Sequence, residues 1–199
     1  ERPIPTVEGY PDLQAFNTAL ADHIENHPAL FEFETYEITH FGREVKNILH
    51  PAARPIDAWR QMVTGEIENY ISALGETPQH PLAAAVPATW RLSAWANILG
   101  AEGYQSPHIH ENAWLSGVYY IQVPSGGDLE SNAGNIAFGP PGDEFDLRIP
   151  IETTWHRPAA GLLLLFPSYW YHHTAPTADA SGRIAIAFDV VPTAPRNEK

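Results

Sequence analysis

The sequence predicts a mainly β protein, with an antiparallel jelly roll, or double-stranded β-helix, and helices packed outside it. Beyond residue 90 the chain consists of short apolar or alternating runs separated by Gly and Pro. The runs are residues 90–99, 104–110, 114–123, 128–138, 145–149, 161–166 and 182–191. Short strands at this spacing are typical of antiparallel sandwiches and barrels. Before residue 90 the apolar residues recur instead at helical spacing.

Two amphipathic helices are expected in this first part. One begins after Asp12, a suitable N-cap, and ends near His27. The other begins after Pro55 and ends at Gly75. The second helix has an apolar stripe formed by Trp59, Met62, Val63, Ile67, Tyr70, Ile71 and Leu74. Both stripes favour packing against the back of a sheet.

The segments around these helices are less regular. Residues 30–50 alternate loosely, which predicts one or two strands joined by Gly42. Residues 1–11 are rich in Pro and are expected to be extended, and residues 78–88 are expected to form a loop. Together, residues 1–89 form a helical part that supports the sheet, and residues 90–192 form the core of a single domain.

Composition excludes several classes of protein. The 199 residues include no cysteine, so disulfides, thiolate ligands and cysteine nucleophiles are ruled out, and a metal must be held by His, Asp or Glu. A formal net charge of −13 argues against nucleic acid or an anionic membrane as the main partner. The longest apolar run, residues 162–166, is too short to span a bilayer. We expect a cytoplasmic protein, with residues preceding Glu1, and exposed sheet edges make a homodimer a candidate assembly.

A pair of histidines is the centre of the sequence. His108 and His110 stand directly before the apolar run that starts at Trp114. In extended chain, residues i and i+2 point to the same face, so both imidazoles can face one point. His172 follows a distant apolar strand that breaks at Pro167, and it can supply a third ring. Three such ligands with open positions suit non-haem iron(II).

Three motifs in this part of the chain resemble those of a known family. They are His108-Ile-His-Glu-Asn-Ala-Trp-Leu-Ser-Gly-Val-Tyr-Tyr-Ile121, Gly161-Leu-Leu-Leu-Leu-Phe-Pro-Ser-Tyr-Trp-Tyr-His172 and Arg183-Ile-Ala-Ile-Ala-Phe188. In order and spacing they resemble the motifs of one group of 2-oxoglutarate- and iron(II)-dependent oxygenases, a group of bacterial and phage proteins of mostly unknown substrate. The likeness covers roughly residues 90–192 and implies a jelly-roll dioxygenase.

The resemblance also implies roles for single residues. His108, His110 and His172 take the places of the metal ligands, and Arg183 takes that of the basic residue that holds the far carboxylate of 2-oxoglutarate. A guanidinium suits this role because it pairs with a carboxylate through two parallel hydrogen bonds. Tyr104 and Tyr120 are further candidates for contact with the cosubstrate.

Position 110 departs from the wider superfamily, which has Asp or Glu there. An all-histidine site lacks one negative charge, so its complex with iron(II) and dianionic 2-oxoglutarate would be neutral. Glu111 and Asn112 are alternatives to His110 as the third ligand, although Glu111 would have to turn to the opposite face. A second, milder departure is Phe188-Asp189, where the family has Phe-Asn.

The substrate pocket is the least determined part of the site. Trp95 and Asn97 share one face of the strand that precedes the histidines, and Asn112 and Trp170 are further candidates for its lining. The sequence favours an oxygenase that hydroxylates an unidentified small molecule or peptide. Two alternatives stay open: a cupin-like three-histidine metalloenzyme without 2-oxoglutarate, and a jelly-roll binding protein without catalysis. Arg183 distinguishes the oxygenase from the first alternative, because that chemistry needs no arginine to hold a carboxylate. Metal analysis of the purified protein distinguishes it from the second, which has no need of bound iron.

Overall fold

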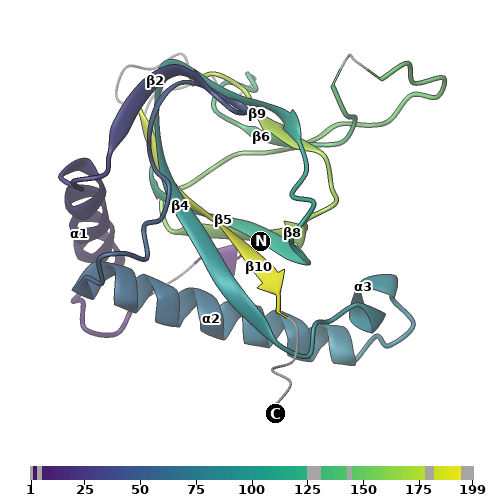
Figure 1. Ribbon diagram of the computed structural model, residues 1–199, viewed down its shortest axis with the longest axis horizontal. Coiled ribbons are helices and arrows are strands. Elements are labelled where there is room, and N and C mark those ends of the chain that lie inside the picture. Colours follow the sequence, from purple (N-terminus) through teal and green to yellow (C-terminus); the bar gives the residue numbers. More distant parts are fainter. Residues whose placement is uncertain (1, 4–5, 125–130, 143–144, 178–181, 194–199) are drawn as a thin grey trace, which may run out of the picture.

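The computed structural model describes residues 2–3, 6–124, 131–142, 145–177 and 182–193. The elements in chain order are β1 (Arg2–Pro3), α1 (Leu13–Glu25), β2 (Phe31–Tyr36), β3 (Thr39–Val45), α2 (Arg54–Gly75), α3 (Pro81–Ala84), β4 (Trp90–His108), β5 (Leu115–Gln122), β6 (Ile136–Phe138), β7 (Thr154–His156), β8 (Leu162–Pro167), β9 (His172–Thr174) and β10 (Arg183–Pro192). The mainly β fold with helices outside the sheet is as predicted (Figure 1).

The described strands form one antiparallel sheet that curls into two facing layers. The order along the main path is β1-β8-β5-β10-β4-β9-β6-β7, and the β2–β3 hairpin attaches to β4 through β3. The strands β5, β8 and β10 form the layer nearest α2, and β6 and β9 lie across from it (Figure 1). The space between the two layers holds the site described below.

The long strand β4 joins the two layers. Its residues 90–99 pair with β10, whereas Gln105 and His108 pair with β9 beyond an irregularity in register. Between these parts lies Gly103, where a Cβ would come within 2.8 Å of the Phe41 carbonyl oxygen. Glycine therefore permits the close approach of β3 at the bend. The strands predicted at 90–99 and 104–110 are thus one strand that ends at residue 108.

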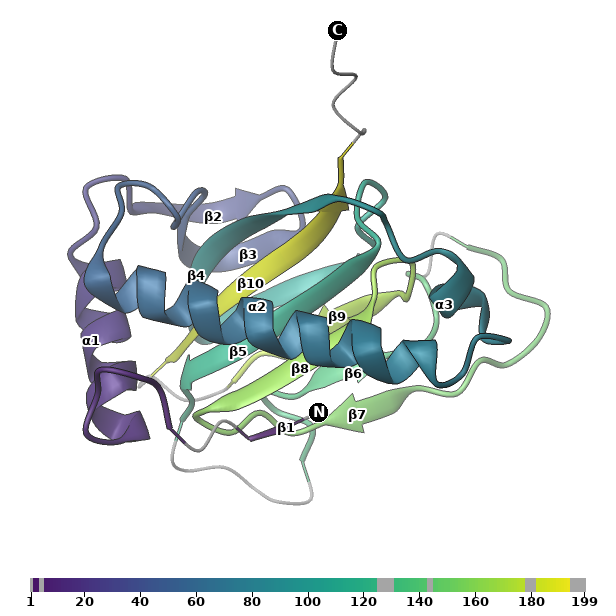
Figure 2. The same ribbon diagram turned by 90° about the horizontal axis from the view of Figure 1, so that it is seen from below.

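Both long helices cover the outer face of the larger layer, as predicted (Figure 2). The α1 helix begins where Asp12 accepts a hydrogen bond of 2.7 Å from the Ala15 amide, a regular N-cap. The α2 helix buries Trp59, Val63 and Ile67 completely. Each such side chain stabilises the fold by about 1.5–3 kcal/mol relative to exposure.

Alternation along β5 separates two cores. Tyr119 faces the helices and donates a hydrogen bond of 2.7 Å to Asn17. Its neighbour Tyr120 faces the space between the layers, where it packs with Phe166 and Ile136. The outer core thus fixes the helices on the sheet, and the inner core supports the candidate site.

Gly117 in the middle of β5 gives a test of this packing. A Cβ at this position would collide with the ring of Phe188 and lie 2.7 Å from the Leu164 carbonyl oxygen. We expect Gly117→Ala to lower the free energy of unfolding by about 3 kcal/mol, as overpacking does. Urea unfolding measures this change in free energy.

The matched control is Gly65→Ala in α2, where a Cβ meets nothing within 4 Å. It should stabilise the fold by about 0.5–1 kcal/mol, because alanine favours helix. Equal effects of the two variants would contradict this account.

Several predicted boundaries were wrong. The turn between β2 and β3 lies at Glu37 and Ile38, whereas Gly42 lies inside β3, opposite Phe33. No strand forms at residues 145–149, where Leu147 and Ile149 are exposed, and the strand in this region is β7. The strand predicted at 128–138 is reduced to β6 in its described part, and residues 128–130 lie outside the described residues.

The structure also adds short elements to segments predicted as extended chain or loop. The two residues of β1 pair with β8, and α3 forms within residues 78–88. In the described part of the chain, no helix combines the length and the apolar character that crossing a membrane requires.

Candidate active site

Three histidines converge between the two layers. His108 ends β4, His172 begins β9 directly opposite it, and His110 follows in the loop after β4. Their ring centroids lie 4.1 Å (108 to 172), 5.1 Å (110 to 172) and 5.2 Å (108 to 110) apart. One ring nitrogen of each lies within 4.8 Å of the others. This arrangement suits a single metal ion.

The hydrogen bonds of the rings determine which nitrogen is free. Nδ1 of His108 lies 2.7 Å from the Ser106 carbonyl oxygen, and Nδ1 of His172 lies 3.0 Å from that of Trp170. A carbonyl oxygen only accepts, so both Nδ1 atoms carry the proton. The Nε2 lone pairs are therefore free to bind a metal, as in metal sites whose ligands are oriented by a hydrogen bond at the other nitrogen.

Burial keeps two of these rings neutral. It lowers the pKa of His108 to about 4, and it lowers the pKa of His172 well below its ordinary value. The neighbouring histidines act in the same direction on both groups. Neutral imidazole is the form that binds a metal, so the site does not have to release protons from these two rings at neutral pH.

Asp189 stands behind the third ring. Its Oδ1 accepts a hydrogen bond of 2.7 Å from Nδ1 of His110 and one of 2.6 Å from the Ser116 hydroxyl. The Ser168 hydroxyl lies 2.9 Å from that of Ser116, and the Ser168 carbonyl oxygen accepts the His110 amide at 2.9 Å. One network therefore fixes both the backbone and the ring of His110 and places a carboxylate next to it.

A buried cavity leads from the histidines to Arg183. The guanidinium is 3% exposed and donates a hydrogen bond of 3.0 Å to the Gly134 carbonyl oxygen. Burial lowers the pKa of Arg183, and burial raises that of the adjacent Tyr120 to about 12. Among the described residues no carboxylate pairs with Arg183. A buried, unpaired guanidinium is costly, so it indicates a site for an anion.

The wall of this cavity is narrow and largely apolar. Trp95, Asn97, Val118, Ile136, Phe166, Thr174, Ala185 and Ala187 line it. The side chain of Asn97 is buried, and its Oδ1 has no hydrogen-bond partner in the part of the chain that the structure describes. A buried amide group without a partner is unusual in a folded protein. It therefore offers a polar contact to a ligand held between the histidines and Arg183.

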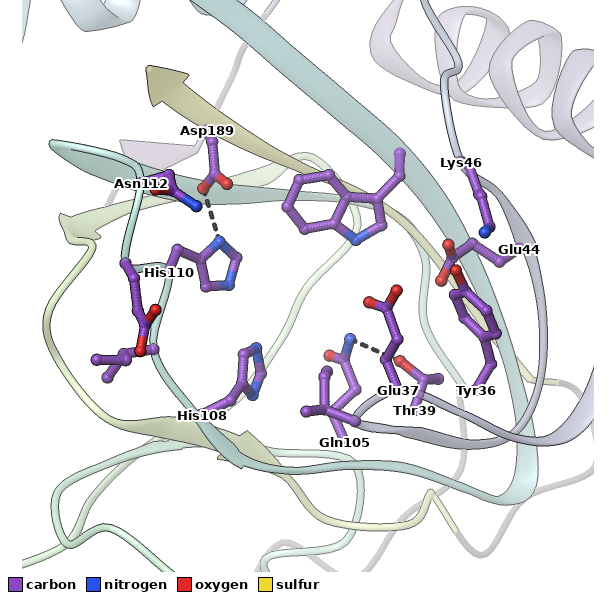
Figure 3. A pocket seen from close by; sticks show the side chains of 14 residues that line it. Tyr36, Glu37, Thr39, Glu44, Lys46, Gln105, His108, His110, Asn112 and Asp189 are labelled. Carbon is purple, nitrogen blue, oxygen red and sulfur yellow. Dashed lines mark hydrogen bonds and ion pairs between the residues drawn. The ribbon is translucent and has the colours of Figure 1, made fainter. Parts of the chain in front are cut away.

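A second, outer pocket of about 420 Å³ also opens onto His108 and His110 (Figure 3). The β2–β3 hairpin and the segment after it form its far wall, with Tyr36, Glu37, Thr39, Glu44 and Lys46. The near wall contains Trp95, Gln105, His108, His110, Glu111, Asn112 and Asp189. A molecule in this pocket would lie beside the candidate metal ligands. Four carboxylates and one ammonium group line it.

The environment of Glu44 destabilises the ionised form of its carboxyl group. Burial raises its pKa from 4.5 to about 7, repulsion from Glu37 adds to this, and Lys46 opposes it. Because the pKa is higher in the folded state, the unfolded chain ionises first as pH rises through 4.5. The contribution of Glu44 to stability therefore falls between pH 4.5 and about 7 and is constant above.

We expect Glu44→Gln to remove this loss. Relative to the wild type, the variant gains about 1–2 kcal/mol in unfolding free energy between pH 4.5 and 8, a range discounted because the carboxyl faces a solvent-accessible pocket. Unfolding by guanidinium chloride at pH 4.5 and at pH 8 measures the free energy of unfolding of both proteins. Glu34→Gln, an exposed position on the same hairpin, serves as control and should change stability equally at both. A parallel pH dependence of wild type and Glu44→Gln would contradict the assignment.

The structure brings together most of the predicted site residues. His108, His110, His172, Arg183, Tyr120, Trp95 and Asn97 line the inner cavity, and Asn112 lines the outer pocket. Among the described His, Asp and Glu side chains, Glu111 does not join the cluster that His108, His110 and His172 form. Asn112 lies on the same side of the pocket as Asp189 (Figure 3).

Two predicted residues lie elsewhere. Tyr104 stacks on His40 at 4.4 Å, because alternation along β4 turns it away from the face of Gln105. Trp170 is 48% exposed and meets the edge of Phe138 outside both cavities, because it lies in the turn between β8 and β9.

Sequence reasoning missed Asp189 and the acidic hairpin. A signal for Asp189 was present, since Arg183, Ala185, Ala187 and Asp189 alternate along β10 and share one face. The two alanines leave room for a ligand between the charged groups. No comparable signal existed for Glu37 and Glu44, because their strands pair across the sheet with a segment more than fifty residues away.

Solved structures with the same fold are enzymes of one class. A prolyl-4-hydroxylase of Pseudomonas putida matches with a TM-score of 0.55 at 14% identity, over 96% of this chain and 92% of that one. A prolyl hydroxylase of Trichoplax adhaerens, in complex with a peptide fragment, matches with a TM-score of 0.60 at 12% identity, over 94% and 81%. The epimerase SnoN from nogalamycin biosynthesis is described as non-haem and α-ketoglutarate dependent. It matches with a TM-score of 0.62 at 16% identity, over 90% of this chain and 74% of that one. Their fold is the jelly roll of these oxygenases.

The sequence itself carries the family assignment. Residues 93–189 match the model of the family described as "Putative 2OG-Fe(II) oxygenase". The resemblance seen in the three motifs is thereby confirmed, and with it the class of enzyme: an oxygenase of the 2-oxoglutarate and iron(II) dependent family. Among curated protein sequences, none matches the chain.

Proposed function

We propose that this protein uses iron(II), 2-oxoglutarate and dioxygen to hydroxylate an organic substrate, with His108, His110 and His172 as the metal ligands. One observation carries the proposal: three imidazole nitrogens converge at one end of a cavity whose other end holds a buried guanidinium that no carboxylate of the described residues pairs with. A metal and a dicarboxylate are the two ligands that satisfy these ends.

The residues present fit both groups. Imidazole nitrogen is a suitable ligand for iron(II), and three side chains leave coordination positions open. Arg183 has four further N–H donors beyond its bond to Gly134, enough to hold a carboxylate through two parallel hydrogen bonds. Tyr120 and Asn97 lie on the same cavity wall and can orient the rest of the dicarboxylate.

Iron supplies the oxidising chemistry when it is bound, coupling decarboxylation of 2-oxoglutarate to succinate and CO₂ with transfer of one oxygen atom from O₂ to a substrate carbon. The protein positions the reactants and limits access of water. Phe138 and Phe166 pack against the ring of His172, with centroids 6.1 and 4.7 Å away. These rings shield the inner side of the site, so the open approach to the histidines is through the outer pocket.

Asp189 compensates for the absence of a carboxylate ligand. In our proposal the negative charge lies behind the His110 ring, where Asp189 accepts a hydrogen bond from Nδ1–H of His110 and makes Nε2 more electron-rich. The charge of the carboxylate is thus retained near the metal although position 110 is histidine.

Replacing this carboxylate gives a prediction. Asp189→Asn should weaken binding of iron(II), or of cobalt(II) as a stable substitute, by about 10- to 100-fold, as the loss of a partner behind a metal ligand does. Competition with a chelator dye measures the dissociation constant without turnover. Ser116→Ala removes one hydrogen bond to Asp189 but leaves its charge, and it should have a clearly smaller effect. Equal metal affinity of Asp189→Asn and the wild type would remove Asp189 from the site.

Solved complexes support the choice of ligands. SnoN has been crystallised with Fe³⁺ and α-ketoglutarate, and HygX of Streptomyces hygroscopicus with nickel and 2-oxoglutarate. A three-histidine enzyme without 2-oxoglutarate is the main rival. It has no use for a buried guanidinium at the far end of the cavity, whereas the proposed reaction requires one.

The direct test measures succinate. Purified protein with iron(II), ascorbate and 2-oxoglutarate should release succinate slowly without substrate, and the release should require both iron(II) and O₂. Isotopic labelling of 2-oxoglutarate at C1 follows the CO₂ formed in parallel. Protein that binds stoichiometric metal yet forms neither product would favour the rival enzyme. Protein that binds no metal would favour a binding module.

A further inference from the structure

We propose that the outer pocket binds a cationic group of the substrate, an alkylammonium or a guanidinium, through Glu37 and Glu44. The inference rests on the proposed function, because it assigns 2-oxoglutarate to the inner cavity, which Arg183 lines, and the substrate to the outer pocket, which it does not line. The argument itself depends on three features of the described residues: an unpartnered buried carboxylate, an excess of negative charge, and a wall that already accommodates an ammonium group.

Glu44 is the first feature. The residue is 7% exposed and lines the pocket, and among the described residues its carboxylate has no hydrogen-bond partner. Figure 3 shows it directed, together with Glu37, into the space that faces His108 and His110. A buried carboxylate without a partner costs stability. A bound cation would supply that partner.

Glu37 adds a second charge in a costly conformation. It lies in the turn of the β2–β3 hairpin with φ of 52°, a left-handed conformation that Gly or Asn adopts more readily. Like-charge repulsion between Glu37 and Glu44 contributes to the raised pKa of Glu44. Strain and repulsion at the same place are typical of sites that are built for a ligand.

The pocket as a whole is acidic. Glu37, Glu44, Glu111 and Asp189 line it together with one basic residue, Lys46. An anionic substrate would meet repulsion on both walls, whereas a cation is attracted into the pocket and held there. Dianionic 2-oxoglutarate has its own cationic partner, Arg183, in the inner cavity. The two cavities therefore differ in charge, so the anionic 2-oxoglutarate would bind in the inner cavity and a cationic substrate in the outer pocket.

Lys46 shows that the far wall suits an ammonium group. Its Nζ lies 4.3 Å from the centroid of the Tyr36 ring. A hydrogen bond with the Tyr36 side chain is the main cause that raises the pKa of Lys46, and Glu37 and Glu44 act in the same direction. Lys46 and Glu37 are both exposed, so they lie at the rim, whereas Glu44 is buried and lies deeper in the pocket. Trp95 lines the same pocket and offers a second aromatic face for a cation.

The experiment titrates metal-free protein with matched probes. N-acetyl-lysine amide represents a basic protein side chain and butylamine a free amine, while N-acetyl-norleucine amide is neutral and N-acetyl-glutamate amide is anionic. Dissociation constants come from amide shifts in ¹H–¹⁵N NMR spectra. Binding without metal is independent of succinate release, so failure here is distinguishable from failure of the proposed oxygenase.

We expect at least one cationic probe to bind at least about 10-fold more tightly than the neutral match, with the anionic probe weakest. Glu44→Gln and Glu37→Gln should each raise its dissociation constant by about 5- to 10-fold. Glu32→Gln lies on the same hairpin but lines a different cavity, and it should leave the constant unchanged. The cationic probe with the lower dissociation constant shows whether the ammonium group belongs to a protein side chain or to a free amine. Equal binding of cationic and neutral probes, or a Glu44→Gln variant with unchanged affinity, would overturn the proposal.

Discussion

His172→Ala is expected to abolish succinate release and to weaken metal binding by more than about 100-fold. Residues that only support a metal ligand contribute about 10- to 100-fold, and His172 is placed to bind the ion itself. Of the three histidines it is the most buried, and its Nδ1 is held by the Trp170 carbonyl oxygen. No water can easily replace a ring enclosed by Phe138 and Phe166.

The neighbouring histidine provides the control. His173 points to the other side of β9, where its ring meets the edge of Trp155 at 5.3 Å. His173→Ala should therefore retain metal binding and succinate release. His172→Gln guards against a folding defect, because it preserves a polar side chain of similar length. Unchanged turnover in both His172 variants, with native circular dichroism, would reject the ligand assignment.

Arg183→Met should raise the KM for 2-oxoglutarate by about 10²–10³-fold, since the loss of one partner of a buried, hydrogen-bonded charge pair costs about 2–5 kcal/mol. The same variant should not be less stable than the wild type without ligand. A buried charge without a partner destabilises the fold, and an apolar side chain of similar size does not. A ligand-binding arginine and a structural one therefore predict opposite changes in stability.

Thermal unfolding with and without 2-oxoglutarate separates these cases. In the wild type, 2-oxoglutarate at 100 times its dissociation constant adds about 2.7 kcal/mol of stability, and in Arg183→Met the same concentration should add almost none. Arg91→Met is the control, since Arg91 is exposed at the start of β4. A destabilised Arg183→Met variant with an unchanged KM would mean that Arg183 serves the fold alone.

The fold class and the three histidines were predictable because local pattern determines them. Alternation identified most strands, and a spacing of two residues placed His108 and His110 on one side. The strand predicted at 145–149 shows the limit of such patterns. Phe145, Leu147 and Ile149 alternate, yet they are exposed, because this segment finds no strand to pair with among the described residues.

The outer pocket could not be predicted for a related reason. The carboxylate of Glu44 faces the histidines only because β3 pairs with β4, and the register of that pairing shifts between His40 and Gly42. Gly42 suggested a turn, but it lies within β3, where a Cβ would come within 2.7 Å of Leu99 Cδ2 and 3.2 Å of the Ile98 carbonyl oxygen. Which side chains meet across a sheet depends on register, and a shift of one residue exchanges the faces.

The attachment of the β2–β3 hairpin has an evolutionary consequence. The groups proposed for iron and 2-oxoglutarate lie on or beside β4, β9 and β10, whereas Glu37 and Glu44 belong to a hairpin that joins the sheet through β3 alone. If the hairpin selects the substrate, as we propose, substrate choice and oxidation chemistry can diverge separately. A changed hairpin would then alter which molecules are accepted, while the groups on β4, β9 and β10 stay in place.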